Sequence, residues 1–362
     1  MAAQAKIAVI GTGWWATTAH IPGLKEQDKV EVVLIDSDST ALHVAASAYG
    51  IANAFSSLSD ALAACPDLMG AIVAVPHRYH YDVGRAVLES GLHLLIEKPM
   101  TLVAPHARHL IELADKRGLQ LVVGYFYPYV PLFQEARKRI EDGLVGDIEY
   151  ITCSMSSMTV ELLRGNPDAY RQVLPYPVVL PGKNTYSDPS VAGGGQGHLQ
   201  VTHSTGMMFA LADDLRAESV SAFMNKLDTR VDIADAFAVR MENGAVATIG
   251  STGNIGAGDR GVLEVHLHGS KGRLRVDLSA GQLYVRQHTG KEEFLQLDGV
   301  LNLGQKSSQH FVDLLLGVGT NSAPGRTVGL YSVELLDAAY RSASQDGQSV
   351  RVASLYENFN DE

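Results

Sequence analysis

The first third of the chain alternates short apolar runs with amphipathic segments, and this alternation limits the fold more than any other feature. Five runs have the composition of buried β-strands, in the order KIAVIG, VEVVLID, MGAIVAV, LHLLIEK and LQLVVGY. The segments between them, such as STALHVAASAYG and APHARHLIELADKRG, carry apolar residues at helical spacing and end on a glycine. Alternating strands and helices predict an α/β domain of the doubly wound type, with a parallel sheet covered on both faces.

From about residue 146 the pattern changes to a series of β-rich runs. They include DIEYITCSMSSM, DAFAVRM, AVATIGST and GVLEVHLHG, and Asn243-Gly244 is a strong tight-turn signal between two of them. We expect an α+β domain with a large open, mainly antiparallel sheet. Two final helical patterns should pack on this sheet or return to the first domain. Because 362 residues with 46% hydrophobic content exceed one ordinary core, we predict two domains, residues 1–125 and 126–362.

Composition argues against several classes of protein. No stretch approaches the roughly 20 apolar residues of a membrane span, and the N-terminal residues lead into a strand without a signal-peptide pattern, so we expect a cytoplasmic protein. The formal charge is −11 without a Lys/Arg block, which argues against nucleic-acid and membrane partners. Cys65 and Cys153 lie far apart, so neither a disulfide nor a metal site is indicated. The expected partner is a small molecule.

A glycine motif follows the first predicted strand. Gly11, Gly13 and Ala16 form GxGxxA before a helix, where backbone amides can approach a pyrophosphate. The second strand ends at Asp36, where a carboxylate can accept hydrogen bonds from an adenosine ribose. Asp38 is nearby and no arginine directly follows Asp36, so a ribose 2′-phosphate would be repelled. These residues predict NAD, in preference to NADP, as the cofactor.

The third and fourth strands also end in polar residues. Ligands of doubly wound sheets bind at the carboxyl ends of the strands. We therefore expect these strand ends to line the cofactor crevice with Pro76, His77, His80, Glu97, Lys98 and Pro99. Trp14 and Trp15, inside the glycine motif, are candidates for covering the nicotinamide or the substrate, although ordinary packing explains them equally well.

The order and spacing of several motifs resemble the Gfo/Idh/MocA oxidoreductase family over nearly the whole chain. The motifs are the GxGxxA start, HIPGL at 20–24, VPHRYH at 75–80, HLLIEKPM at 93–100, VGYF at 123–126, EDGLVGDI at 141–148 and GGGQGHLQVTH at 193–203. The resemblance implies a Rossmann domain and a sugar or polyol substrate. It also implies a second domain whose sheet forms a homodimer or homotetramer, and a hydrogen bond from Lys98 to the reacting hydroxyl.

The segment after the glycine run departs from that family pattern. The family commonly has an aspartate four residues before a histidine; here the histidine is His203, but the aspartate position is Leu199. On an α-helix Gln196, Gln200 and His203 would share one polar face, available to a substrate. We predict that His203 accepts the proton, since an imidazole of near-neutral pKa suits deprotonation of a hydroxyl. His198 is a weaker candidate.

A second departure follows the fifth strand, where the chain reads GYFYPYVP. Tyr125, Tyr127 and Tyr129 either line the sugar site, with Tyr127 a candidate acid or base, or simply pack in the core. A Pro/Gly-rich loop adds Tyr186 as a candidate substrate contact. Arg164 in the same region could grip an anionic group, although solvated loop charges are commoner.

Three functional hypotheses follow. The first is an NAD-dependent dehydrogenase that moves a hydride between a sugar or cyclitol carbon and nicotinamide. The second is an NAD-dependent glycoside hydrolase that works by a redox-neutral cycle of oxidation, elimination, hydration and reduction, which the missing aspartate and the Thr202-His203 pair make credible. The third is a non-enzymatic dinucleotide-binding sensor or scaffold, against which the intact Glu97-Lys98-Pro99 sequence argues.

Overall fold

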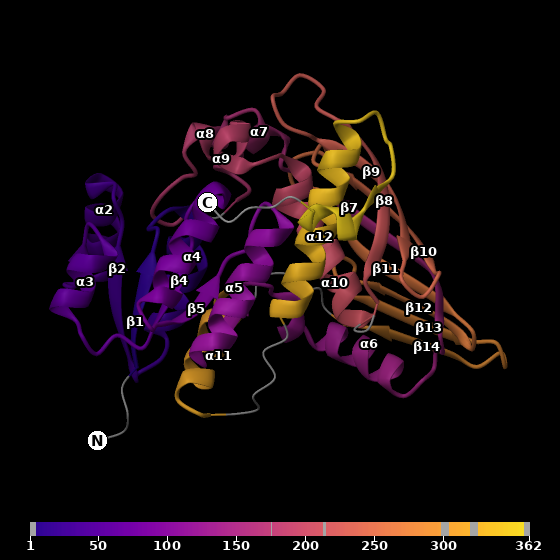
Figure 1. Cartoon of the computed structure of the whole chain (residues 1–362), viewed down its shortest axis with the longest axis horizontal. Coiled ribbons are helices and arrows are strands. Elements are labelled where there is room, and N and C mark those ends of the chain that lie inside the picture. Colours follow the sequence, from indigo (N-terminus) through magenta and orange to yellow (C-terminus); the bar gives the residue numbers. More distant parts are fainter. Residues whose placement is uncertain (1–4, 175, 213–214, 298–303, 319–324, 358–362) are drawn as a thin grey trace.

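Two sheets organise the protein in the computed structural model, which describes residues 5–174, 176–212, 215–297, 304–318 and 325–357 (Figure 1). One sheet belongs to the N-terminal part of the chain and the other to the C-terminal part. The fold class predicted from the sequence is confirmed. No helix in these ranges is long and apolar enough to cross a membrane.

The first sheet has six parallel strands in the order β3-β2-β1-β4-β5-β6. The strands are β1 (Ala5–Ile10), β2 (Val30–Ile35), β3 (Ala54–Phe55), β4 (Gly70–Val73), β5 (His93–Ile96) and β6 (Leu121–Val123). The direction of winding reverses between β1 and β4, and ligands bind at such switch points. The sequence predicted all of these strands except the two-residue β3.

Helices connect the strands of the first sheet. They are η1 (Ala16–His20), α1 (Ile21–Lys25), α2 (Ser39–Tyr49), α3 (Leu58–Ala64), η2 (His77–Tyr79), α4 (His80–Glu89) and α5 (Ala104–Arg117). Gly50 and Gly118 end α2 and α5 at φ values of 64° and 65°, a left-handed conformation that glycine adopts without strain. The predicted glycine stops are confirmed at these two helices.

The second sheet has nine strands in the order β14-β13-β12-β11-β7-β10-β9-β8-β15. The strands are β7 (Ile148–Ser156), β8 (Ala217–Asn225), β9 (Ala234–Met241), β10 (Val246–Thr252), β11 (Val262–Gly269), β12 (Gly272–Asp277), β13 (Gln282–Gln287), β14 (Glu292–Gln296) and β15 (Val350–Arg351). All neighbours pair antiparallel except β7 and β10, which are parallel. Figure 1 shows α6 (Pro131–Glu141), α10 (Thr202–Leu211) and α12 (Arg326–Ala343) on one face of this sheet.

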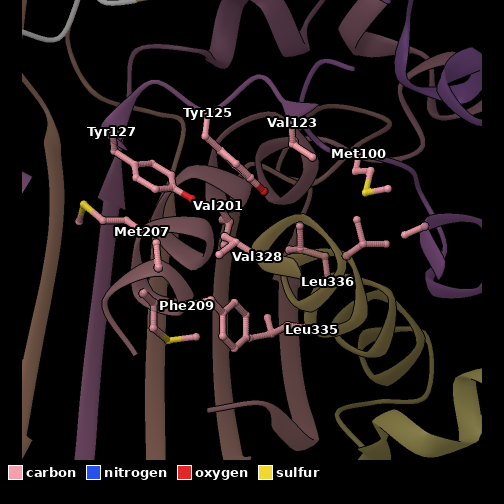
Figure 2. Close-up of a cluster of buried hydrophobic side chains, with 14 of the residues drawn as sticks. Met100, Val123, Tyr125, Tyr127, Val201, Met207, Phe209, Val328, Leu335 and Leu336 are labelled. Atoms are coloured by element: carbon pink, nitrogen blue, oxygen red, sulfur yellow. The ribbon is translucent and has the colours of Figure 1, made fainter. Parts of the chain in front are cut away.

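Figure 2 shows part of the core between these helices and the sheet, where Phe209 of α10 lies beside Leu335 of α12 and Met207 lies near Tyr127. The last two helices go to different places, so both predicted alternatives occur. α11 (Gly304–Leu315) returns to the first sheet, where Phe311 joins the core beside β1 and β2, whereas α12 packs on β8.

A long insertion between β7 and β8 carries short helices toward the first sheet. They are α7 (Val160–Leu163), η4 (Pro167–Tyr170), α8 (Lys183–Ser187), α9 (Pro189–Ala192) and η5 (Gly197–Val201). α9 contacts η2, and a ring nitrogen of His77 lies 3.1 Å from the carbonyl oxygen of Ala192. In Figure 1 the helices α7, α8 and α9 lie above β4 and α4. The insertion therefore reaches the carboxyl end of the parallel sheet.

Candidate active site

The glycine loop after β1 is shaped for the close approach of a ligand. Gly11 has φ of 90°, and a Cβ there would lie 2.6 Å from the carbonyl oxygen of Ala74, so no side chain fits. A Cβ on Gly13 would meet no heavy atom within 4 Å. The loop is thus packed tightly at Gly11 and open at Gly13, where a pyrophosphate can reach the backbone amides.

Asp36 is held beside this loop at the end of β2. One carboxylate oxygen accepts hydrogen bonds from the backbone nitrogen and the hydroxyl of Thr12, at 2.7 and 2.9 Å. The other accepts one from the backbone nitrogen of Asp38 at 2.9 Å. Two carboxylate oxygens offer about four acceptor positions, so capacity is left for a ribose hydroxyl. The carboxylate is therefore oriented before any ligand binds.

Glu97, at the end of β5, is buried and accepts three hydrogen bonds from the protein. The donors are the indole nitrogen of Trp15 at 2.9 Å, the ring of His20 at 3.0 Å and the backbone nitrogen of Lys98 at 3.1 Å. Burial acts to raise the pKa of Glu97, but His20 and Lys98 together hold it below its ordinary value. Glu97 and Trp15 thus support the site through contacts inside the protein. His20 was not among the site residues predicted from the sequence. The only signal for it there was its place as the first residue of the HIPGL motif.

His80 is 1% exposed and links two backbone segments. One ring nitrogen lies 2.7 Å from the carbonyl oxygen of Pro99, and the other lies 2.9 Å from that of Val75. The Lys98-Pro99 peptide bond between β5 and α5 is cis. Because both ring nitrogens of His80 have protein partners, we no longer propose this residue as a cofactor ligand. Half-buried Pro76 remains a candidate at the start of η2.

Lys98 lies where the two parts of the chain meet. Its ammonium donates a hydrogen bond of 3.0 Å to the main-chain carbonyl oxygen of Leu199, in η5. Burial lowers the pKa of Lys98, and the Glu97 carboxylate opposes that shift. Leu199 occupies the position where the resemblance leads one to expect an aspartate. At this position the ammonium of Lys98 therefore donates to a backbone carbonyl oxygen, and the Leu199 side chain offers no carboxylate.

The segment from Gly197 to Val201 is a π-helix, so the expected α-helical spacing does not hold there. Gln196 is fully buried, and its amide oxygen accepts a 2.7 Å hydrogen bond from the Thr159 hydroxyl. Its amide nitrogen donates to the Ser251 hydroxyl at 3.0 Å. The prediction of one polar face shared by Gln196, Gln200 and His203 is therefore wrong, because Gln196 is bound to the sheet. Gln200 is half-buried and stays a candidate substrate contact.

His203 follows on α10, beside the ring of Phe126 at a centroid distance of 5.3 Å. Its Nδ1 is buried and has no hydrogen-bond partner in the described part of the chain. Burial, and then the charge of Lys98, lower the pKa of His203 well below its ordinary value. The expectation of a near-neutral pKa is thus wrong. The ring is therefore neutral at neutral pH, and the same burial and charge make it a weaker proton acceptor than an ordinary imidazole.

The tyrosines after β6 separate into different environments. Figure 2 shows Tyr125 and Tyr127 in the core near Val201, and each is 1% exposed. Tyr127 packs against Phe133 at a centroid distance of 5.0 Å, so we no longer propose it as a catalytic residue. Tyr129 lies next to His310 of α11, and burial raises the pKa of its hydroxyl.

Tyr186, from the insertion, does approach the site. Its ring centroid lies 6.2 Å from that of His77. Burial, and then the charge of Glu97, raise the pKa of its hydroxyl. Tyr186 is therefore a neutral hydrogen-bonding group close to the carboxyl ends of β4 and β5. Trp14 contacts the same insertion through an edge-on contact with Tyr176, with centroids 5.5 Å apart.

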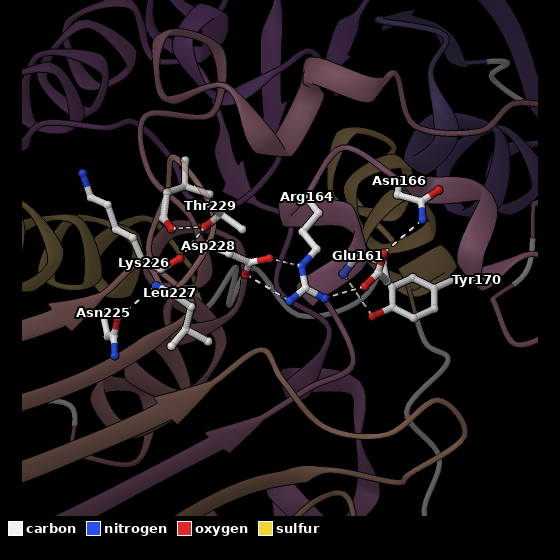
Figure 3. A network of polar contacts seen from close by, with 10 residues as sticks. Glu161, Arg164, Asn166, Tyr170, Asn225, Lys226, Leu227, Asp228 and Thr229 are labelled. Atoms are coloured by element: carbon white, nitrogen blue, oxygen red, sulfur yellow. Dashed lines mark hydrogen bonds and ion pairs between the residues drawn. The ribbon is translucent and has the colours of Figure 1, made fainter.

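Arg164 does not present its charge to the site. Figure 3 shows its guanidinium between two carboxylates. Two of its nitrogens each lie 3.0 Å from an oxygen of Asp228, and a third lies 2.6 Å from Glu161. This bidentate geometry ties α7 to the turn before β9. The guanidinium therefore has a structural explanation without an anionic ligand.

Comparisons with known proteins agree with this geometry. Residues 5–125 match the description "oxidoreductase family, NAD-binding Rossmann fold", and residues 133–275 match the GFO/IDH/MocA C-terminal domain. The chain is 29% identical to the D-glucoside 3-dehydrogenase of Escherichia coli over 41% of its own length and 42% of that protein. Alignments with the first curated relatives cover less than half of those proteins.

Solved structures share the fold at low identity. Levoglucosan dehydrogenase, in complex with NADH and levoglucosan, superposes with a TM-score of 0.78 at 18% identity, over 96% of this chain and 99% of that one. GenD2 from gentamicin A biosynthesis, in complex with NAD, gives 0.77 at 22% identity over 97% of each chain. The two matched domains together span most of the chain. With its NAD-binding Rossmann domain and its C-terminal sheet domain, the protein belongs to the Gfo/Idh/MocA oxidoreductase family.

Proposed function

We propose that the protein is an NAD-dependent dehydrogenase that transfers a hydride between a carbohydrate or cyclitol carbon and nicotinamide. The observation that carries the proposal is the place of Lys98. It lies at the carboxyl end of a parallel strand next to the switch point, and its ammonium is within hydrogen-bond distance of the second domain. A charged donor at this junction suits a hydroxyl group that loses its proton as hydride leaves.

The residues present fit the cofactor. The open surroundings of Gly13 leave room for a pyrophosphate, and the oriented carboxylate of Asp36 can accept hydrogen bonds from the adenosine ribose. NAD supplies, when bound, an acceptor for the hydride. Asp36 would also repel a ribose 2′-phosphate, which supports NAD in preference to NADP.

The protein's own part in the reaction is to bind the hydroxyl and move its proton. Lys98 would donate a hydrogen bond to the reacting oxygen and stabilise the negative charge that develops there. His203, neutral because of burial and the nearby ammonium, would accept the proton. The same ammonium disfavours the protonated ring, so we expect the proton to pass on to solvent. Tyr129, Tyr186 and Gln200 remain candidate contacts to other hydroxyls.

A carbohydrate substrate is supported by the relatives, which are named for glucoside and levoglucosan oxidation. We therefore propose a sugar, a glycoside or a cyclitol as the substrate. The test is to incubate the protein with NAD and a panel of free sugars, cyclitols and aryl glycosides, recording both reduced-nicotinamide absorbance and aryl-alcohol release. Reduced nicotinamide formed in step with one substrate would support the proposal. NAD-dependent aryl-alcohol release without net reduction would refute it in favour of the redox-neutral glycoside hydrolase.

The second sheet suggests a homo-oligomer. Helices lie on one face of it (Figure 1), and exposed apolar side chains along its strands include Phe223, Val246 and Phe294, at 65%, 47% and 64% exposure. Exposed apolar side chains on a sheet face that no described helix covers favour association, although these three lie on strands that are not neighbours. We propose that this sheet forms the contact of a homodimer or homotetramer. Sedimentation velocity of the wild type and of Val246→Arg tests it, and a monomeric wild type would contradict it.

A further inference from the structure

A carboxylate far from the site in sequence holds the glycine run that precedes η5. Asp232, in the turn before β9, is 2% exposed. One of its oxygens accepts a hydrogen bond from the backbone nitrogen of Gly195 at 2.7 Å, and the other accepts one from Gly197 at 2.7 Å. The Tyr340 hydroxyl of α12 adds a third donor at 2.8 Å. The carboxylate therefore binds the first backbone donors of the helical segment, which have no partner within the helix.

The close packing of the glycine run against Asp232 and Tyr340 leaves no room for side chains. A Cβ on Gly195 would lie 2.0 Å from the carbonyl oxygen of Asp232, and a Cβ on Gly194 or Gly197 would lie 2.2 or 2.6 Å from the Tyr340 hydroxyl. The backbone nitrogen of Gln196 also donates to the Asp232 carbonyl oxygen, at 2.8 Å. Three of the four glycines in GGGQG are thus explained by close approach, Gly195 to the backbone of Asp232 and Gly194 and Gly197 to the side chain of Tyr340.

This arrangement leads directly to the proposed catalytic lysine. The backbone nitrogen of Leu199 donates to the carbonyl oxygen of Gly195 at 2.9 Å, so the fixed glycine fixes the next turn. The carbonyl oxygen of Leu199 then accepts the hydrogen bond from the Lys98 ammonium. A chain of four hydrogen-bonded groups therefore runs from Asp232 to Lys98. Asp232 does not touch Lys98, and Glu97 is the carboxylate whose charge acts on the pKa of Lys98.

We propose that Asp232 is a positioning residue that holds the Leu199 carbonyl against Lys98, at a site that lacks the usual aspartate. The inference rests on the proposed function only for its kinetic readout. Losing the carbonyl removes a group that stabilises the ammonium, so the pKa of Lys98 should fall when Asp232 is changed. The glycine loop and Asp36 lie on other elements, so NADH affinity should not change.

The test compares Asp232→Asn with the wild type and with Asp235→Asn. In the wild type the backbone nitrogens of Gly195 and Gly197 donate to different oxygens of Asp232. Asparagine has only one side-chain oxygen, so its amide nitrogen would face one of these two N–H groups. Asp235 is the matched control: its buried carboxyl lies beside that of Asp232 but binds none of the backbone donors of the glycine run. Burial, and then the charge of Asp232 and a hydrogen bond with it, raise the pKa of Asp235 well above its ordinary value. Asparagine is nearly isosteric with aspartic acid, and its amide nitrogen can still donate a hydrogen bond to Asp232.

Three readouts are measured for each protein. The first is the pH profile of Lys98 acylation by a small amine-reactive acylating reagent, followed by mass spectrometry, which needs no substrate. The second is kcat and KM with the best substrate of the carbohydrate panel, and the third is the Kd of NADH. For Asp232→Asn we expect the pKa of Lys98 to fall and kcat to fall roughly tenfold, with KM and NADH affinity changed by less than about threefold. Asp235→Asn should match the wild type.

An unchanged Lys98 profile in folded Asp232→Asn would overturn the inference. An Asp235→Asn variant with the same losses would also overturn it, because the effect would then be a general loosening of this buried cluster. Thermal denaturation confirms that the variants are folded. If the wild type oxidises no carbohydrate, the proposed function fails, and the Lys98 profile still decides the role of Asp232.

Discussion

Removing the carboxylate of Asp36 should change which dinucleotide the protein prefers. In the wild type the carboxylate is fixed by Thr12 and by the backbone of Asp38, beside the open part of the glycine loop. In Asp36→Ala the ribose loses a charged acceptor, and a 2′-phosphate loses a repelling charge. We therefore expect NAD affinity to fall while NADP affinity stays constant or rises.

The size of the effect follows from the number of bonds lost. A hydrogen bond to a charged group contributes about 1.5–3 kcal/mol, which corresponds to a roughly 10- to 150-fold weaker Kd for NAD. Isothermal titration of wild type and variant with both dinucleotides measures it. Asp36→Ala also frees two donors of Thr12, and that loss acts on both dinucleotides equally. The ratio of the two dissociation constants is therefore the informative quantity.

Asp38→Ala is the matched control. The Asp38 side chain accepts hydrogen bonds from the backbone nitrogens of Thr40 and Ala41, at 2.9 and 3.1 Å, and so caps α2. Its loss should cost about 1 kcal/mol of stability and should change the ratio of the NAD and NADP dissociation constants far less than the loss of Asp36, because the Asp38 carboxylate is turned to the start of α2. Equal weakening of NAD and NADP in Asp36→Ala would refute the assignment of Asp36 as the ribose ligand.

Three other variants test separate parts of the structure. Lys98→Ala should reduce turnover by roughly 10²- to 10⁴-fold with NAD affinity nearly unchanged, and normal steady-state rates would exclude the proposed role. His198 is buried, stacks on Tyr340, and burial lowers its pKa to about 4. Since the unfolded chain has a histidine pKa of about 6.5 and binds the proton first, stability should be lost as pH falls from about 6.5 to 4, by about 1.4 kcal/mol per unit. His198→Phe should remove the contribution of His198 to the dependence of the unfolding free energy on pH, measured by urea denaturation at several pH values. The same pH dependence in wild type and variant would contradict the assignment. Arg164→Ala should leave kcat/KM within about twofold, because its guanidinium is bound by Asp228 and Glu161, whereas a large loss would indicate an anionic substrate group.

Part of the site could be predicted from the sequence because it depends on local order along one chain segment. A strand, a glycine turn and a helix place Gly11, Gly13 and Asp36 together through the known geometry of a parallel sheet. The same rule placed Lys98 at a strand end. Apolar runs were sufficient for the longer strands of the first sheet and β-rich runs for most strands of the second, whereas β3, β14 and β15 were not predicted.

The assignments made from residue type were less successful. Tyr127 and His80 carry groups that suit an active site, but the structure places Tyr127 among core side chains and binds both ring nitrogens of His80 to carbonyl oxygens. Gln196 was placed by assuming α-helical spacing, whereas a π-helical turn follows it. Side-chain chemistry alone does not give burial or partners, because both come from elements distant in sequence.

The sequence by itself determined where most strands and helices lie along the chain, where the glycine turns fall and which polar residues follow the strands. These features depend on local backbone preferences and on the local pattern of apolar residues. Only the tertiary structure decided that the Leu199 carbonyl faces Lys98 and that Asp232 fixes the glycine run. Asp232 lies 35 or more residues from each glycine that it binds. Contacts over such separations depend on how the two sheets and their helices pack, and no local pattern records them.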